Sequence, residues 1–266
     1  VTGLENPLGM DPKVRTPLPN LASGWTFSES GDVFTLKIRP GLRWSDGHSF
    51  TSFDFLFWYR HVLLNDELTP VIRPRLQDIK LSTPDSTTVV FSMPKPYPFL
   101  IDELAHHGAN FFAPAHFMKN YHPDFVDRDS LEARAEREGF IGWAAYFNAI
   151  RGNNLSEPTF TPTMNAYFLN RKSPTLQIFE RNPYYPKVDP DGNQLPYLDE
   201  IMVLIVKNPE VVTAKTSTGQ SHFSGNGLKT ADIPLFKMGE KNARVYNPHL
   251  EPSPGGGCSD TTQSDR

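Results

Sequence analysis

The sequence predicts an α/β fold of the mixed α+β kind, and two early patterns carry this prediction. In residues 34–38, Phe34, Leu36 and Ile38 alternate with polar side chains, which is the period of a strand with one buried face. From Thr51 onwards, apolar residues instead share one face at helical spacing. The chain has 266 residues, enough for two domains.

The composition is that of a globular protein and excludes several classes of function. Hydrophobic residues make up 38% of the chain and charged residues 21%, and the net charge is −4. This balance gives no basic surface for nucleic acid or for an anionic membrane, so we expect neither partner. The 25 prolines and 12% aromatic residues indicate long, packed irregular connections.

Redox and targeting signals are few. Cys258 is the single cysteine, so no disulfide forms within the chain. No stretch approaches the roughly 18 apolar residues of a membrane span. The chain opens without a charged segment followed by an apolar one, so we expect a secretory signal peptide to be absent or already removed.

An extended start and a strand bounded by turns come first. Residues 1–20 hold four prolines and predict an extended approach to the strand. After the strand, Pro40-Gly41 and Asp46-Gly47 each fit a tight turn, because glycine adopts positive φ without strain. Trp25 and Trp44 offer large apolar surfaces to a small sheet.

A helix and a hairpin are expected next. Thr51 is the predicted N-cap of the helix, and Asp54 at the third position completes a variant of the capping box. Residues 79–81 and 88–91 predict the two strands of a hairpin around Pro84-Asp85.

The remainder alternates irregular segments with short elements. Residues 92–125 are rich in loops and aromatic side chains. Regular elements are predicted in five later segments: helices at residues 130–138, 141–150 and 209–217, and strands at 177–180 and 201–207. The last residues are polar and rich in glycine, which predicts a disordered tail over 249–266.

Three motifs, in order along the chain, resemble the signature of one family. The first ends in Lys37-Ile-Arg-Pro-Gly-Leu-Arg-Trp-Ser-Asp-Gly47, shortly before the predicted helix. The second is Pro114-Ala-His116, and the third is Glu180-Arg-Asn-Pro-Tyr-Tyr185 with the Asp-Gly turn that follows it. On these motifs the chain resembles the family 5 extracellular solute-binding proteins of bacteria over residues 20–205.

The resemblance implies a periplasmic-binding-protein-like fold of the large, three-domain type, in which two lobes close on a ligand like a hinge. It assigns residues 1–112 to the extra N-terminal subdomain of the family and residues 113–248 to part of the first lobe. The second lobe, which follows in the family, is missing from the sequence, so we expect a truncated member.

The resemblance also implies a function, the substrate-binding component of an ABC importer for oligopeptides or similar solutes, located in the periplasm or outside the cell. The implied partners are a small-molecule or peptide ligand and the membrane permease; capture is non-enzymatic and needs no cofactor. A second interpretation is a truncated remnant with only a structural or interaction role. A missing lobe leaves apolar surface exposed, which favours self-association.

Two sets of residues are candidates for the site. The motif residues are interpreted as scaffold, because they form turns and aromatic packing: Trp25, Trp44, Asp46, Gly47, Asn182, Pro183 and Tyr184. The aromatic stretch 97–121 is the better candidate for ligand contact because it lies beside the expected hinge. From it we select Tyr97, Asn110 and Phe111; packing between domains is the alternative role of this stretch.

Metal and catalytic motifs are incomplete. Four histidines fall within 17 residues: His106, His107, His116 and His122. A metal site needs such residues to converge on one ion, and the last two do not share a helix face. The segment from Asp189 resembles a calcium loop without glycine at its sixth place. Ser92-Met-Pro-Lys95 matches a hydrolase motif whose helix the neighbouring prolines prevent. We therefore expect neither a metal site nor catalysis.

Overall fold

The computed structural model describes residues 5–11, 16–152, 161–224, 229–234, 236, 248–252 and 258–262. These residues belong to two compact units. The larger unit contains the described residues up to Ser173 together with Gln177–Val203, and the smaller contains Pro174–Leu176 and the described residues from Leu204 on. None of the described helices is both long and apolar enough to cross a membrane.

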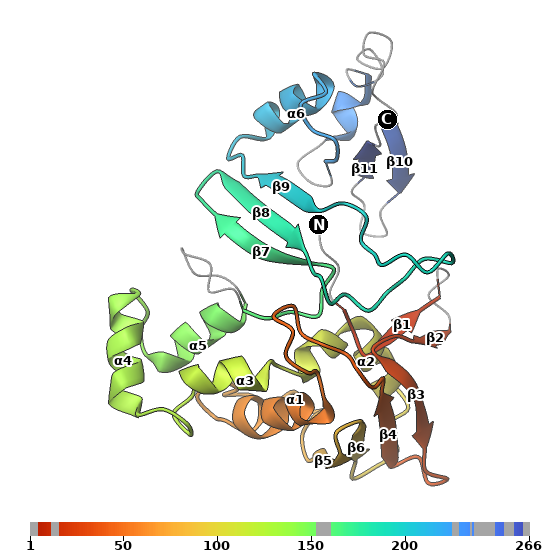
Figure 1. The fold of residues 1–266 in the computed structure, drawn as a ribbon, viewed down its shortest axis with the longest axis vertical. Coiled ribbons are helices and arrows are strands. Elements are labelled where there is room, and N and C mark those ends of the chain that lie inside the picture. The colour runs from red at the N-terminus through yellow and green to blue at the C-terminus, as the bar shows by residue number, and fades with distance from the viewer. Residues whose placement is uncertain are drawn as a thin grey trace. The chain divides into compact units, whose positions relative to one another are not determined.

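A four-stranded antiparallel sheet forms the base of the larger unit (Figure 1). Its strands, in spatial order, are β3 (Ala22–Phe27), β4 (Val33–Ile38), β6 (Thr88–Ser92) and β5 (Lys80–Asp85). The predicted alternation in β4 is confirmed, because Phe34, Leu36 and Ile38 are all buried. The predicted hairpin is confirmed as β5 and β6, which pair in antiparallel register.

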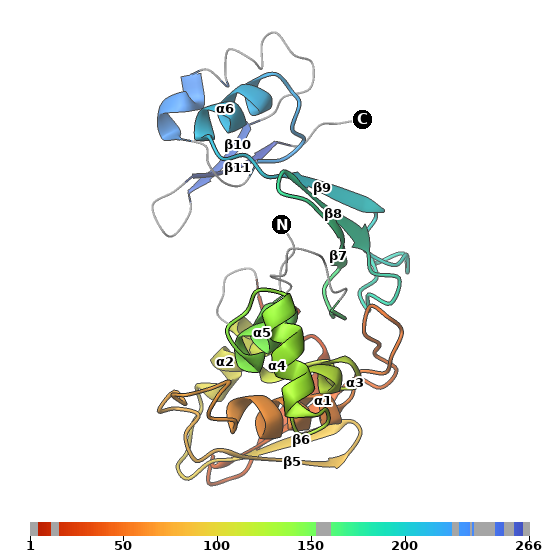
Figure 2. The same ribbon diagram turned by 90° about the vertical axis from the view of Figure 1, so that its left-hand side faces the viewer.

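The helix predicted from Thr51 is α1 (Ser52–Phe57), which lies against β5 and β6 (Figure 2). Its capping box is confirmed: the Thr51 side chain accepts from the amide of Phe53, and the Asp54 carboxylate accepts from the amide of Thr51. Asp54 also accepts from the Trp44 indole and the Ala115 amide. Burial raises the pKa of Asp54. One carboxylate thus joins the helix start to two distant segments.

Further helical segments follow α1 along the chain. They are the π-helix η1 (Trp58–Leu63), α2 (Leu100–His106), the 3-10 turn η2 (Gly108–Phe111), α3 (Ala115–Met118), the 3-10 turn η3 (Lys119–Tyr121), α4 (Arg128–Arg137) and α5 (Trp143–Arg151). The segment 92–125 is therefore more helical than its sequence predicted. Helices this short are stabilised by tertiary packing more than by propensity, so their sequence signal is weak.

One hydrophobic cluster runs through the larger unit, from Leu8 to Met164. It continues across the boundary expected between two domains at residue 112, where Phe111, Phe112 and Ala113 are all buried. The division into an extra subdomain and a partial first lobe stays a prediction about the family's arrangement.

Two smaller sheets complete the described strands up to residue 204. β1 (Leu8–Met10) pairs with β2 (Pro17–Pro19), within the segment expected to be merely extended. A three-stranded sheet has the order β7 (Tyr167–Lys172), β8 (Leu176–Arg181) and β9 (Glu200–Leu204). The strands predicted at 177–180 and 201–207 are β8 and a shorter β9, whereas β7 was not predicted.

In the smaller unit, α6 (Pro209–Ser217) matches the predicted helix, with Asn208 as its N-cap. Within the predicted tail of residues 249–266, the structure describes two strands, β10 (Pro248–Pro252) and β11 (Cys258–Thr262), which pair with each other, and the disorder of the tail stays a prediction.

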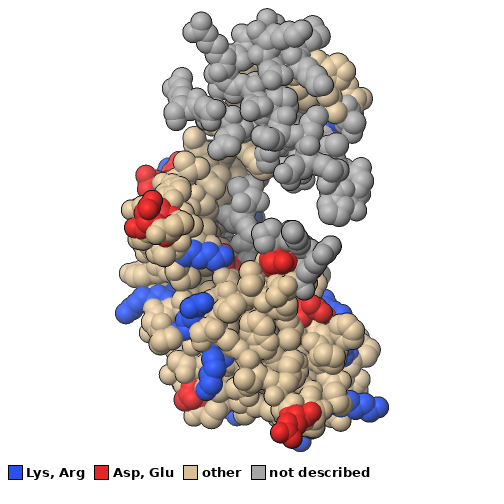
Figure 3. Space-filling view, turned by 90° about the vertical axis from the view of Figure 1, so that its right-hand side faces the viewer, with Lys and Arg blue, Asp and Glu red and all other residues tan. Residues whose placement is uncertain are grey.

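The surface of the larger unit carries charges of both signs. On the face shown in Figure 3, acidic and basic side chains are interspersed and do not gather into a patch of one sign. On this face, such a mixed distribution provides no extended field to steer a polyanion.

Candidate functional site

The three motifs that are far apart in the sequence meet in the larger unit. The Nε2 atom of His116 lies 2.7 Å from the Asp46 carboxylate, which joins the second motif to the first. A Cβ atom added to Gly47 would lie 2.9 Å from the Tyr184 hydroxyl, so the third motif also touches the first. Between them, Ser45 and Thr163 exchange backbone and side-chain hydrogen bonds. The motif residues therefore form one continuous contact region.

The two tryptophans differ in their surroundings. Trp44 is buried, and its ring packs edge-on against Phe50 and Phe112 with centroid distances of 5.4 and 5.9 Å. Trp25 is partly buried on β3 and packs against the edge of the main cluster. Both contacts are with the protein's own apolar side chains, which favours the scaffold role expected for them.

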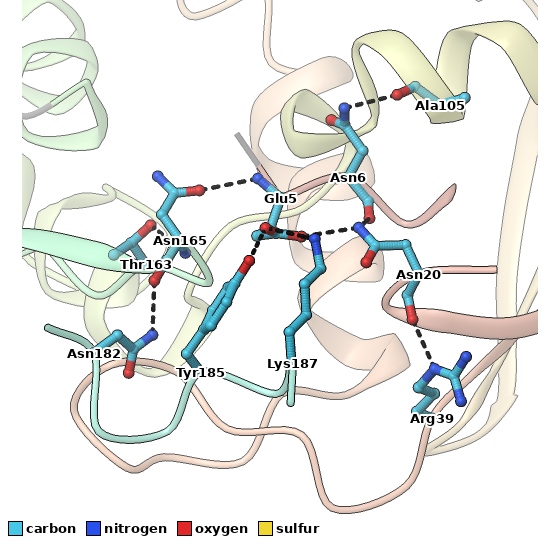
Figure 4. Close-up of polar contacts among 10 residues, drawn as sticks. All are labelled: Glu5, Asn6, Asn20, Arg39, Ala105, Thr163, Asn165, Asn182, Tyr185 and Lys187. Carbon is cyan, nitrogen blue, oxygen red and sulfur yellow. Dashed lines mark hydrogen bonds and ion pairs between the residues drawn. The ribbon is translucent and has the colours of Figure 1, made fainter. Parts of the chain in front are cut away.

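Beside this region, the carboxylate of Glu5 is the centre of a buried polar cluster (Figure 4). Glu5 is 8% exposed. Its carboxylate accepts hydrogen bonds from the Tyr185 hydroxyl at 2.5 Å, the side-chain amide of Asn20 at 2.9 Å and the Lys187 ammonium at 2.9 Å. Burial and the Glu5 carboxylate together raise the pKa of Tyr185. A buried carboxylate is tolerated here because each donor compensates part of its lost hydration.

Two asparagines extend the cluster to the third motif. The amide of Glu5 donates to the side chain of Asn165, and the side-chain nitrogen of buried Asn182 donates to the Asn165 carbonyl at 2.9 Å. The side-chain oxygen of Asn182 accepts from the amide of Tyr184, and the carbonyl of Pro183 accepts from Gln194. Asn182 thus shapes the backbone turn of its own motif.

The cluster ties together segments that are distant in the sequence, namely residues 5–6, 20, 163–165 and 182–187. Sequence analysis did not select Glu5, Asn20, Asn165 or Lys187. No local pattern marks them, because each hydrogen-bonding partner is at least 15 positions away from Glu5.

The residues predicted to contact ligand lie on either side of α2. Tyr97, before the helix, is half-buried against the core, and burial raises its pKa. Asn110, in η2, is exposed, and its carbonyl accepts from Arg151. Phe111 is 3% exposed and packs on Trp58 at a centroid distance of 4.9 Å. Tyr97 and Asn110 keep exposed surface, whereas Phe111 is a core residue.

The histidines of residues 106–122 separate into different surroundings. His116 pairs with Asp46, and its ring stacks on His48. His122 is fully buried and lies near Asp124. Within the described part of the chain, one group of side chains is arranged as metal ligands would be: His61, His122 and Asp124. Sequence analysis missed this group because His61 lies 61 positions before His122.

The segment resembling a calcium loop is held by its own donors. The Asp189 carboxylate accepts from the amides of Asp191 and Asn193, from the Asn193 side chain and from the Tyr197 hydroxyl. These donors lower the pKa of Asp189 to about 2. The observed role of Asp189 is to close a turn, as expected.

Comparison with known proteins connects this structure to one group. The sequence profile described as bacterial extracellular solute-binding proteins, family 5 middle, matches residues 16–257. The periplasmic alpha-galactoside-binding protein of Rhizobium meliloti (strain 1021) is 31% identical over 190 residues, which cover 70% of this chain and 25% of that protein. A probable ABC transporter-binding protein of Deinococcus radiodurans is 26% identical over 218 residues, 80% of this chain and 33% of that protein.

Solved structures are similar over nearly the whole chain. An oligopeptide-binding protein OppA superposes with a TM-score of 0.82 and 27% identity, over 95% of this chain and 41% of that one. The periplasmic binding protein MelB of Agrobacterium fabrum, solved with stachyose, superposes with a TM-score of 0.70 and 24% identity, over 94% of this chain and 36% of that one. The expected periplasmic-binding-protein-like fold is confirmed, and the chain spans a quarter to two-fifths of the length of these proteins.

Proposed function

Because the chain belongs to the bacterial extracellular solute-binding proteins of family 5, we propose that it captures a solute, without chemical change, for the membrane permease of an ABC importer. Its relatives are periplasmic or extracellular binding proteins, and we place this chain in the same compartment. Tight sites enclose about 70–90% of a ligand's surface. We therefore expect this chain to supply one wall of a site and to bind weakly by itself.

The solute that we propose first is an α-galactoside oligosaccharide. The observation that carries this choice is the 31% identity to the alpha-galactoside-binding protein over 70% of the chain. A short oligopeptide, the class expected from the sequence, is the second candidate, favoured by the TM-score of 0.82 with OppA.

Tyr97 and Asn110 are the residues that we propose for ligand contact. An aromatic ring offers a sugar or a peptide a flat apolar surface with a polar edge, and an exposed amide donates and accepts hydrogen bonds. Phe111 supports this wall from beneath, since it is packed on Trp58 next to exposed Asn110.

Titration of the purified chain with raffinose, stachyose and trialanine tests the proposal, with tryptophan fluorescence and the thermal midpoint as readouts. Binding to the folded state raises the midpoint by linkage. We expect a saturable response to the sugars, weakened about tenfold or more by Tyr97→Ala or Asn110→Ala. Ile141→Ala is the matched control, because Ile141 is 98% exposed on another part of the larger unit.

Each outcome of this titration has a defined meaning. A response to trialanine alone reassigns the solute to peptides. A cooperative melt that shifts with none of the ligands supports the second interpretation, a chain with a structural or interaction role. Recovery of intact sugar after incubation is expected, and hydrolysed sugar would contradict capture without chemistry.

A further inference from the structure

We propose that His61, His122 and Asp124 form a binding site for a divalent transition-metal ion such as Zn²⁺. One nitrogen of each histidine and one carboxylate oxygen lie within 4.8 Å of one another. Two imidazoles and one carboxylate are ligands that Zn²⁺, Co²⁺ and Ni²⁺ accept, whereas Ca²⁺ and Mg²⁺ prefer oxygen ligands alone. The site is independent of the solute proposed above.

Two of the distances between these atoms lie on either side of the spacing expected for ligands of one ion, and all three atoms lie within 4.8 Å of one another. The Nδ1 atom of His61 lies 2.6 Å from an Asp124 oxygen, and the Nδ1 atom of His122 lies 3.6 Å from the same oxygen. Ligand atoms bound tetrahedrally to zinc at about 2 Å are roughly 3.3 Å apart. The Asp124 side chain is 55% exposed, so solvent surrounds much of it, and admission of the ion would require this side chain to rotate.

The orientation of the His122 ring supports this role. Its Nε2 atom lies 2.9 Å from the carbonyl oxygen of His61, so the ring proton is assigned to Nε2. A metal-bound histidine characteristically donates its other ring N–H to a carbonyl or carboxylate in this way. The Nδ1 atom of His122 accepts a hydrogen bond from the backbone amide of Asp124 at 3.2 Å. A bound ion would replace this hydrogen bond.

The backbone that carries His61 is also unusual. His61 belongs to the π-helix η1, in which the amide of Leu64 donates to the carbonyl of Tyr59, five residues earlier. Turns of π-helix occur frequently at functional sites, because they re-aim side chains. This observation is separate from the ligand distances and points to the same residue.

Burial defines how an ion reaches the group. His122 is fully buried, with the rings of Trp143 and Phe147 at centroid distances of 5.2 and 5.8 Å. His61 and Asp124 are partly exposed, which leaves an approach from solvent. The ion would link η1 to the turn that precedes α4, and it would stabilise the folded chain by linkage.

The test uses protein without a histidine tag, stripped with a chelator. Calorimetric titration with Zn²⁺ and visible absorption with Co²⁺ measure binding. We expect one ion per chain, with the affinity reduced at least tenfold in His61→Ala and in Asp124→Ala. His106→Ala is the matched control, since His106 is an exposed histidine elsewhere, and it is expected to bind as the wild type does.

Both test positions are partly exposed, so the variants are expected to fold, and their cooperative melts verify this. Zn²⁺ should also raise the thermal midpoint of the wild type and of His106→Ala but not of the two ligand variants. Absence of saturable binding, or equal affinity in wild type and His61→Ala, would overturn the site. Neither result affects solute binding, which is measured with the metal removed.

Discussion

At position 47 the backbone has a φ of +85°, and a side chain there would meet the hydroxyl of Tyr184. Left-handed backbone costs a residue with a Cβ about 1–2 kcal/mol. We therefore expect Gly47→Ala to lower the free energy of unfolding by at least that amount, measured by urea denaturation. The clash of the added Cβ with Tyr184 increases this loss beyond the cost of the left-handed backbone.

Two other glycines distinguish the cost of the left-handed backbone from the cost of the Tyr184 contact. Gly41 has a φ of +81° with nothing within 4 Å of an added Cβ, so Gly41→Ala carries the backbone cost alone. Gly24 has the same open space without positive φ, so Gly24→Ala is expected to be nearly neutral. If Gly47→Ala proved as mild as Gly24→Ala, neither the turn nor the Tyr184 contact would be essential.

The Glu5 carboxylate is the second feature that acts through individual residues. Tyr185→Phe removes one of its donors, and a hydrogen bond to a charged group contributes about 1.5–3 kcal/mol. We expect a loss of this size in the free energy of unfolding. In a double-mutant cycle with Glu5→Gln the two losses should fall short of additivity, because both changes remove the same bond.

Tyr184→Phe is the control for this cycle, since Tyr184 is the neighbouring, exposed tyrosine of the motif. Tyr184→Phe should lower the free energy of unfolding by no more than about 0.5 kcal/mol, as most surface substitutions do. Strict additivity of Tyr185→Phe and Glu5→Gln would show that the 2.5 Å contact contributes nothing to stability.

Among the elements, the hairpin of β5 and β6 makes a contribution to folding stability that depends on pH. Three donors from Thr87 and Thr88 lower the pKa of Asp85 from 3.8 to about 2. A carboxylate with a lowered pKa stabilises the folded state above its unfolded pKa. This contribution is lost as the pH falls from 3.8 through about 2. Wild type should therefore exceed Asp85→Asn in its urea midpoint at pH 6.

The difference between these two proteins should shrink as the pH falls from 3.8 through about 2, and it should disappear only below the lower pKa, where the Asp85 side chain is neutral in the folded and the unfolded state. Thr88→Val is the companion variant, because it removes one donor and should raise the pKa of Asp85 seen by NMR titration. If the urea midpoints of wild type and Asp85→Asn differed equally at pH 6 and at the lower pH, Asp85 would not be the source of the pH dependence.

For the whole molecule, we propose the exposed strand β9 as the surface through which the self-association predicted from the sequence occurs. Among the described strands, β9 lies at the edge of its sheet, and Met202 on it is 66% exposed. Tyr197 and Leu198, which precede the strand, are also exposed. Edge strands with apolar side chains favour pairing between chains. We expect sedimentation velocity to detect concentration-dependent dimers.

Met202→Lys should weaken such dimers about tenfold, equivalent to about 1.4 kcal/mol, since it replaces apolar contact with a solvated charge. Ile141→Lys is the control, because Ile141 is exposed but lies outside the sheet. A chain that stays monomeric at all concentrations, or dimers weakened equally by both variants, would refute this interface.

What the sequence determined by itself is local. The alternation at Phe34, Leu36 and Ile38, the capping box of Thr51 and Asp54, and the helix at 209–217 were each predicted and observed. These features depend on residues a few positions apart, whose spacing sets backbone geometry directly. The three motifs likewise identified the family, because turn residues and aromatic anchors keep a fixed order along the chain.

The tertiary structure alone decided which distant side chains meet. It joined Glu5 to Tyr185 and Lys187, brought His61 to His122, and buried Phe111, which the sequence had offered as a ligand contact. The physical reason is that a contact between residues 60 to 180 positions apart depends on how whole elements pack. No spacing in the sequence encodes that packing.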